Sequence, residues 1–359
     1  MGLHGSSTTP VILQDVRVPP DNLLGEVGKG HKVAFNVLNF GRFKLGAMCS
    51  GGAQGAIGEA ARYAAQRKQF GQPIASFGAI KHKLGEMAVR VYALEALLYR
   101  TAGMIDARVD ATPHDLNDGS AALAAFEEFA IEASIAKVVG SEVLEFVLDE
   151  NVQIHGGNGF VHDYPAERHY RDARVNRIFE GTNEINRLLI PGMLARRAAK
   201  GDVGVIAAAR ALQDELMGPS SMPTADGPLL AEEARAVQSY KKAALMVFGT
   251  AMQTYGLKLA DQQEVLMHLA DITMEVYAAE SALLRARSAS LSLGAEARSA
   301  KAAGRRFARR CADRTPSTPT VRSDARFSCS RFRWSSSSRS SRSSPSSTCS
   351  SSDASAPMP

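Results

Sequence analysis

The sequence contains no run of eighteen or more apolar residues and only four cysteines. Without such a run no transmembrane helix is predicted, and residues 1–10 lack the charged-then-apolar pattern of a secretion signal, so we expect a cytoplasmic protein. Cys49 is the only cysteine in the part whose pattern predicts folding, which disfavours a disulfide framework or a zinc site. His155 and His162 have no supporting ligand set, so no metal is predicted.

The composition is otherwise that of a globular protein, with 359 residues, 45% hydrophobic and 22% charged, and room for two domains. Most of the net charge of +5 comes from residues 311–359, a Ser/Arg-rich tail without a periodic apolar face that we expect to be disordered. Such a tail can bind nucleic acid through its phosphates, but it contains no recognisable nucleic-acid-binding domain or motif. A frame-shifted translation of a GC-rich gene has the same composition, and we favour that interpretation, with no nucleic-acid partner.

Apolar residues at helical spacing predict four long helices between residues 30 and 200. The first ends near residue 70, the second contains Ile80, Leu84 and Met87, the third runs from 121 to 154, and the fourth follows Thr182. Long helices with short connections predict an antiparallel four-helix bundle. After a connector at residues 201–228, helical segments at 229–255 and 261–290 predict an additional helical region over residues 201–310.

Glu180 stands between the apolar pair Ile178 and Phe179 and the pair Gly181 and Thr182. Thr182 suits the N-cap of the following helix, because its hydroxyl can accept an orphan backbone N–H. Gly181 gives the preceding turn its backbone freedom. A carboxylate placed on a loop just before a helix, beside apolar side chains, is a candidate general base. The alternative is an ordinary solvated loop glutamate.

Three segments, taken in order, carry a family resemblance: residues 67–77 (RKQFGQPIASF), 153–160 (QIHGGNGF) and 171–185 (RDARVNRIFEGTNEI). They resemble flavin-dependent acyl-CoA dehydrogenases, closely over residues 5–200 and more loosely to about residue 300. The resemblance implies a mainly α chain. Its short β-type runs at 11–13 and 16–18 would be a remnant of the family's middle β-domain within residues 1–29, and the preceding helical domain would be absent.

Residues 24–43 (LGEVGKGHKVAFNVLNFGRF) look most like the very-long-chain branch of that family, which has an additional C-terminal helical domain associated with membrane docking. A membrane-surface helix should combine an apolar face with a strongly basic one. The additional region shows no such pattern, so we expect ordinary helix packing and at most peripheral membrane association.

The activity that the resemblance implies is α,β-dehydrogenation of a long-chain acyl-CoA thioester in fatty-acid β-oxidation. Glu180 would remove the α-proton while a hydride leaves the β-carbon for FAD, and electrons would pass to an electron-transfer flavoprotein. Some branches carry the base at the position of Gly41, where this chain has no acid. By resemblance, the residues near the substrate are Asn39, Phe40, Gly41, Arg42, Phe179 and Gly181.

The same resemblance implies FAD contacts across a subunit interface, and so a homodimer. An arginine can hold a phosphate and a phenylalanine can lie against a flat ring, and glycines expose backbone N–H groups. A helix-ending arginine and a glycine C-cap are the purely structural alternatives. The assigned residues are Arg67, Gln69 and Phe70 at the diphosphate and adenosine end, Gln153, Ile154, His155, Gly156 and Gly157 at the adenine end, and Thr182, Asn183 and Glu184 beside the flavin. A non-catalytic helical dimerisation module of the same family is the alternative function.

Overall fold

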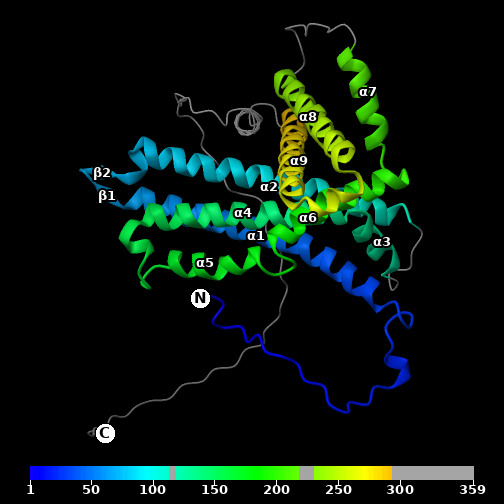
Figure 1. The fold of residues 1–359 in the computed structure, drawn as a ribbon. Coiled ribbons are helices and arrows are strands. Elements are labelled where there is room, and N and C mark those ends of the chain that lie inside the picture. Colours follow the sequence, from blue (N-terminus) through cyan, green and yellow to red (C-terminus); the bar gives the residue numbers. More distant parts are fainter. Residues whose placement is uncertain (113–118, 218–229, 293–359) are drawn as a thin grey trace. The chain divides into compact units, whose positions relative to one another are not determined.

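The computed structural model describes residues 1–112, 119–217 and 230–292, which are mostly helical (Figure 1). All of them belong to one of the chain's two units, Met1–Ser317, and the other unit, Thr318–Pro359, lies outside the described residues. The tail expected at residues 311–359 also lies outside them. In the described part of the chain, no helix is both long enough and apolar enough to cross a membrane.

A bundle of long helices forms the centre of this part of the chain (Figure 1). Helix α1 (Gly30–Gln66) leads through the two-stranded hairpin β1 (Lys68–Gln69) and β2 (Gln72–Pro73) into the antiparallel helix α2 (Gly78–Asp110). Helix α4 (Ala130–His155) packs against both, and α6 (Asn183–Lys200) packs against α4. The predicted mainly α fold with a helical bundle is confirmed.

The most extensive helix contact joins α1 and α4, and small residues make it. A Cβ atom placed at Gly46 of α1 would lie 2.6 Å from the backbone oxygen of Ala136, and one placed at Gly140 of α4 would lie 2.9 Å from the Cα of Gly46. Interaxial distance depends on the side chains at the contact, so these glycines permit a close approach. Further along α1, Ala53, Ala60 and other small residues are buried in the same core.

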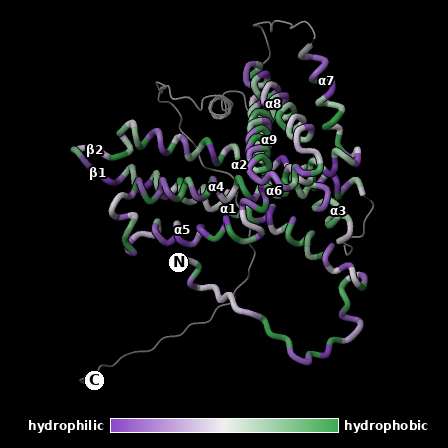
Figure 2. The backbone as a smooth tube through the Cα atoms, in the orientation of Figure 1, coloured by the Kyte–Doolittle hydropathy of each residue, from purple (hydrophilic) through white to green (hydrophobic). Residues whose placement is uncertain are grey.

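The additional helical region consists of α7 (Val205–Met217), α8 (Ala231–Tyr255) and α9 (Gln263–Ser292). Hydrophobic residues recur along α8 and α9 (Figure 2), and some of them join the core of α1, α2 and α4, including Val237, Ala279 and Leu283. Helix α9 packs against α2 and α6. Arg100 of α2 also forms a 3.0 Å ion pair with Glu280 of α9. The region therefore packs onto the bundle as expected, while the domain boundary near residue 200 stays a prediction.

The strands expected at residues 11–13 and 16–18 do not form. Residues 1–29 contain one short 3₁₀ turn (Pro20–Asn22), and the apolar side chains of this segment are exposed. A strand needs a partner for its backbone groups, and in the described part of the chain no other strand pairs with residues 11–18. β-Type composition alone therefore misled the prediction.

Three helical details also differ from expectation. The third helix is divided at Phe129 into α3 (Ser120–Glu128) and α4, and Arg197 of α6 donates hydrogen bonds to the carbonyls of Glu127 and Glu128 that the break leaves free, at 2.9 and 2.7 Å. The expected connector at residues 201–228 contains α7, whose Ala- and Leu-rich sequence favours a helix. The short helix α5 (Ala166–Ala173) was not expected.

We predict that Gly46→Ala destabilises the chain by about 1–3 kcal/mol, because the new methyl group meets backbone atoms of α4 that cannot move aside cheaply. Gly55→Ala is the matched control, since Gly55 lies on an exposed face of the same helix with open space around it. There we expect a gain of about 0.5–1 kcal/mol from helix propensity. Urea denaturation followed by circular dichroism measures both. Equal effects of the two substitutions would contradict the close α1–α4 contact.

Candidate functional site

Glu180 and Gly181 form a left-handed turn directly before α6, with φ angles of 57° and 80°. Thr182 is the N-cap of α6, and its hydroxyl accepts a hydrogen bond from the backbone N–H of Ile185 at 3.3 Å. The predicted cap is therefore confirmed. The positive φ of Glu180 is costly for a residue with a side chain, on the order of 1 kcal/mol or more, and persists only where the surroundings hold it.

Two buried side chains hold the backbone of this turn. The side-chain amide nitrogen of Asn186 lies within hydrogen-bonding distance of the carbonyl oxygens of Glu180, Gly181 and Thr182, at 3.3, 2.9 and 3.0 Å. Arg42 of α1 donates from Nε to the carbonyl of Glu180 at 3.2 Å. The turn that carries Glu180 is thus fixed from α6 and from α1 at the same time.

The carboxylate of Glu180 lies against α1 at Gly41. A Cβ atom at Gly41 would come within 2.6 Å of Oε2 and 2.7 Å of Oε1, so any side chain there would push the carboxylate out of its present position. The neighbouring Arg42 is buried and donates to the side-chain oxygen of Asn39 at 3.2 Å. Burial lowers the pKa of Arg42, and the charge of Glu180 opposes that shift. The structure therefore brings Asn39, Gly41 and Arg42 together with Glu180.

Helix α1 continues without interruption through residues 39–42. The helix itself does not need a glycine at position 41. Gly41 is needed there because the carboxylate of Glu180 lies next to it. Apolar side chains border this place but stay partly open to solvent: Phe40, which makes an edge contact with Phe126 at 5.1 Å, and Ile178 and Phe179.

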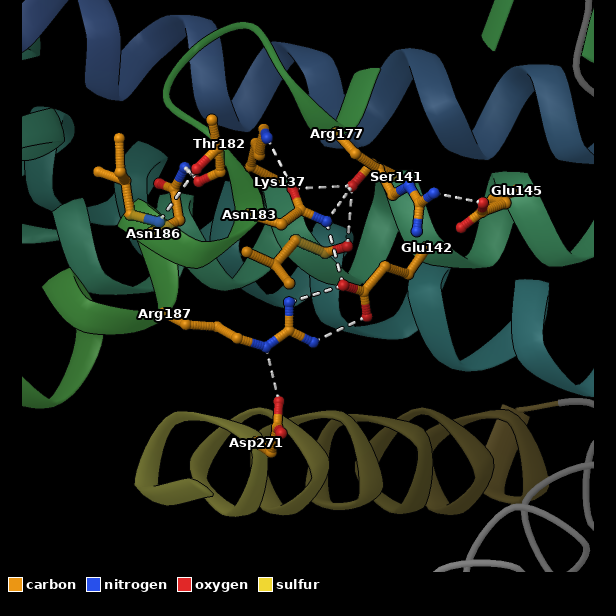
Figure 3. A network of polar contacts seen from close by, with 12 residues as sticks. Lys137, Ser141, Glu142, Glu145, Arg177, Thr182, Asn183, Asn186, Arg187 and Asp271 are labelled. Carbon is orange, nitrogen blue, oxygen red and sulfur yellow. Dashed lines mark hydrogen bonds and ion pairs between the residues drawn. The ribbon is translucent and has the colours of Figure 1, made fainter. Parts of the chain in front are cut away.

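The three residues expected beside the flavin differ in their environment. Asn183 is buried, and its side chain points into the protein, where its oxygen accepts a hydrogen bond from Lys137 at 2.6 Å (Figure 3). Glu184 is exposed, and hydrogen bonds to its carboxylate from its own backbone and from Thr182 lower its pKa. Sequence reasoning missed Lys137, although a lysine among the apolar and small residues of α4 was a visible signal.

The other group of expected contacts lies where α1 and α4 end. Arg67 is the C-cap of α1, and Phe70, at the tip of the hairpin, is 91% exposed with a φ of 52°. Tyr63, one turn earlier, donates to the carbonyl of His155 at 3.2 Å, so the end of α4 lies beside the end of α1.

Within this second group only some members are accessible. Gln153, Gly156 and Gly157 are exposed. The side chains of Ile154 and His155 are buried, and the His155 ring stacks on Tyr63 with centroids 4.0 Å apart. These two side chains are therefore part of the core, and the assignment of both residues as cofactor contacts stays a prediction.

Residues 28–194 match a protein family described as acyl-CoA dehydrogenase, C-terminal domain, and residues 239–317 match a second family with the same description. Together these regions make up more than half of the chain. They are acyl-CoA dehydrogenase C-terminal domains. The first match ends within α6 and the second begins within α8, so that α7 lies between the two matches.

Relatives match along most of this chain. A probable acyl-CoA dehydrogenase of Bacillus subtilis is 48% identical over 298 residues, which cover 82% of this chain and 50% of that protein. The mitochondrial very long-chain specific acyl-CoA dehydrogenase of Rattus norvegicus is 36% identical over 312 residues, covering 82% and 45%. A crystal structure of a Bacillus anthracis acyl-CoA dehydrogenase complexed with FAD has a TM-score of 0.80 and 47% identity, covering 83% and 51%. The chain thus spans about half the length of these relatives.

Cys49 lies in the α1–α4 contact, and burial raises the pKa of its thiol to about 12, although the charge of Lys137 opposes the shift. At pH 8 about one thiol in ten thousand would be ionised, and the thiolate is the reactive form. We predict that native Cys49 resists a thiol reagent at pH 8 under conditions that label the guanidinium-unfolded chain completely. The test uses a variant with serine at Cys311, Cys329 and Cys349, which lie outside the described residues. Rapid labelling of the native chain would contradict this burial.

Proposed function

We propose that this chain supplies the catalytic base and part of the acyl-CoA pocket of an FAD-dependent acyl-CoA dehydrogenase. The observation that carries the proposal is the carboxylate of Glu180, held against Gly41 by a strained turn that Arg42 and Asn186 fix. Strain of this kind is found at functional sites when the surrounding structure enforces it. The family relationship supports dehydrogenation as the reaction.

In this proposal the acyl thioester lies along residues 39–42 of α1, and Glu180 accepts the proton from its α-carbon. Because Gly41 has no side chain, the carboxylate of Glu180 has room beside α1 to approach the α-carbon of the substrate. Phe40 and Phe179 border the same place and would exclude water from it once they are covered. The chemistry that FAD supplies when bound is acceptance of the hydride released from the β-carbon.

The residues at the far end of α1 fit the adenine and diphosphate part of FAD. The exposed ring of Phe70 offers a flat apolar face, Arg67 offers a charge for phosphate, and Gly156 and Gly157 have open space around them. Arg67 lies roughly 40 Å along α1 from Gly41, at 1.5 Å per residue. That distance exceeds the length of an extended FAD molecule, so one FAD cannot contact both groups of a single chain. We therefore propose a homodimer in which each chain contributes to two cofactors.

We further propose a long-chain substrate and an electron-transfer flavoprotein as electron acceptor. The support for a long acyl chain is the rat relative named very long-chain specific, whose match covers 82% of this chain and so continues beyond the bundle. The acceptor follows from the family resemblance. Comparing kcat/KM for acyl-CoA thioesters of increasing length tests the first point, and a maximum at short chains would refute it.

One observation favours the alternative of a non-catalytic dimerisation module. Phe40, Ile178 and Phe179 are partly exposed in this chain, so water reaches the proposed base. The flavin absorbance of the purified 359-residue chain separates the two possibilities. If the chain dimerises without retaining FAD, the result supports the non-catalytic dimerisation module. If it binds FAD stoichiometrically and turns over acyl-CoA, the result supports a complete active site.

We predict that Glu180→Gln lowers kcat by about 10²–10⁴-fold or more while FAD stays bound, because a positioned base contributes on that order. The assay uses a hybrid in which the N-terminal half of the Bacillus subtilis relative precedes this chain. Gly41→Ala should lower kcat by about 10²-fold, since the new methyl group displaces the carboxylate.

Thermal stability of the Gly41→Ala hybrid should not fall, because the flexible end of Glu180 can move and alanine favours the helix. Gly55→Ala, on the exposed face of the same helix, is the control and should retain parental turnover. Parental turnover of Glu180→Gln would end the assignment of the base.

A further inference from the structure

Lys137 is a fully buried lysine in the middle of α4, with 0% of its surface exposed. Its Nζ donates to the side-chain oxygen of Asn183 at 2.6 Å. Burial lowers the pKa of Lys137 to about 8. Placing an ammonium group in a core costs several kcal/mol before its hydrogen bonds are counted. A methionine of similar length would fill the same space without that cost, so packing alone does not account for a lysine here.

The partner of Lys137 is the first residue of α6, three positions after Glu180. Both ends of the Asn183 amide are bound inside the protein (Figure 3). Its oxygen faces Lys137, and its nitrogen donates to the hydroxyl of Ser141 at 3.0 Å and to Glu142 at 3.1 Å. Because its oxygen and its nitrogen each have partners, the Asn183 amide has one orientation. These hydrogen bonds join the first residue of α6 to α4 directly after the turn.

The same chain of contacts continues to α9. The two carboxylate oxygens of Glu142 accept from the guanidinium of Arg187 at 2.6 and 2.9 Å, and the Nε of Arg187 donates to Asp271 of α9 at 2.7 Å (Figure 3). A bidentate arginine pair is directional as well as strong. Helices α4, α6 and α9 are therefore joined by one continuous polar network that ends at the turn bearing Glu180.

We propose that Lys137 is a positioning residue that holds the turn bearing Glu180 through Asn183, and that Asp271 of α9 supports the same turn through Arg187 and Glu142. The importance of the turn for catalysis rests on the proposed function. The network itself is independent of that proposal. Retained buried charges are known in some proteins to specify one arrangement rather than to add stability.

Amide hydrogen exchange of the 359-residue chain tests the proposal without any cofactor. Lys137→Met keeps the volume and removes the donor, whereas Lys137→Gln keeps a side-chain N–H that can reach Asn183. We expect at least a tenfold faster exchange in peptides covering residues 181–187 for the methionine variant, with no decrease in Tm. The glutamine variant should recover most of the parental protection.

Two further variants keep the result interpretable. Ser134→Ala removes another buried polar group of α4, whose hydroxyl donates within its own helix to the carbonyl of Ala130 at 3.0 Å, and should leave residues 181–187 at the parental rate. Asp271→Ala removes the ion pair between the half-exposed Asp271 and Arg187. It should also speed exchange of residues 181–187, although less than Lys137→Met does. In the double variant Lys137→Met with Asn183→Ala, the effects should not add, because both remove the same link.

Parental exchange of residues 181–187 in both Lys137→Met and Asp271→Ala would overturn the proposal. So would faster exchange spread evenly over all helices with a lower Tm, since that pattern indicates general destabilisation. In the hybrid enzyme, Lys137→Met should lower kcat at least tenfold while the KM for acyl-CoA changes less than threefold. If the Glu180→Gln hybrid retains turnover, the proposed function fails, and the exchange results still decide whether Lys137 positions the turn.

Discussion

The close contact between α1 and α4 is the constraint on which both candidate regions, the turn at Glu180 and the shared end of α1 and α4, depend. Gly46 and Gly140 allow the two backbones to approach within distances that any side chain would prevent. At that separation, the turn before α6 can reach α1, so that Glu180 meets Gly41. At the other end, Tyr63 of α1 reaches the last residue of α4. A wider separation would break both contacts, so the small residues of this interface determine the positions of Glu180 and of Tyr63 relative to the neighbouring helices.

A buried charge within such an interface needs a reason beyond stability. Apolar contacts fix how far apart helices lie, but they constrain rotation and register only weakly, because many apolar arrangements have similar energies. Hydrogen bonds are directional, and an unpaired buried donor or acceptor is costly. The side-chain amide of Asn183 accepts a hydrogen bond from Lys137 and donates one to Glu142. Both bonds can form in only one orientation of α6. The orientation of Glu180 therefore depends on directional hydrogen bonds as well as on apolar packing.

Sequence reasoning succeeded where a signal is local and failed where it depends on distant partners. The Thr182 cap, the turn at Gly181 and the helical periodicity are set by neighbouring residues, and the structure agrees with each. The strands expected in residues 1–29 needed partners that one segment cannot reveal. The break at Phe129 is stabilised by Arg197, sixty-eight positions later in the chain. The burial of His155 and the role of Lys137 likewise depend on which helices pack together.

The polar network also connects the additional helical region to the bundle by directional hydrogen bonds. Helix α9 shares its apolar core with α1, α2 and α4, which alone would make it a supporting layer. Asp271 adds a directional bond to Arg187, one turn of α6 after the cap at Thr182. An ion pair with one half-exposed partner contributes little to stability, so the value of this contact lies in the orientation of α6. Helix α9 is thus part of what determines the geometry around Glu180, although it supplies no residue that touches the turn itself.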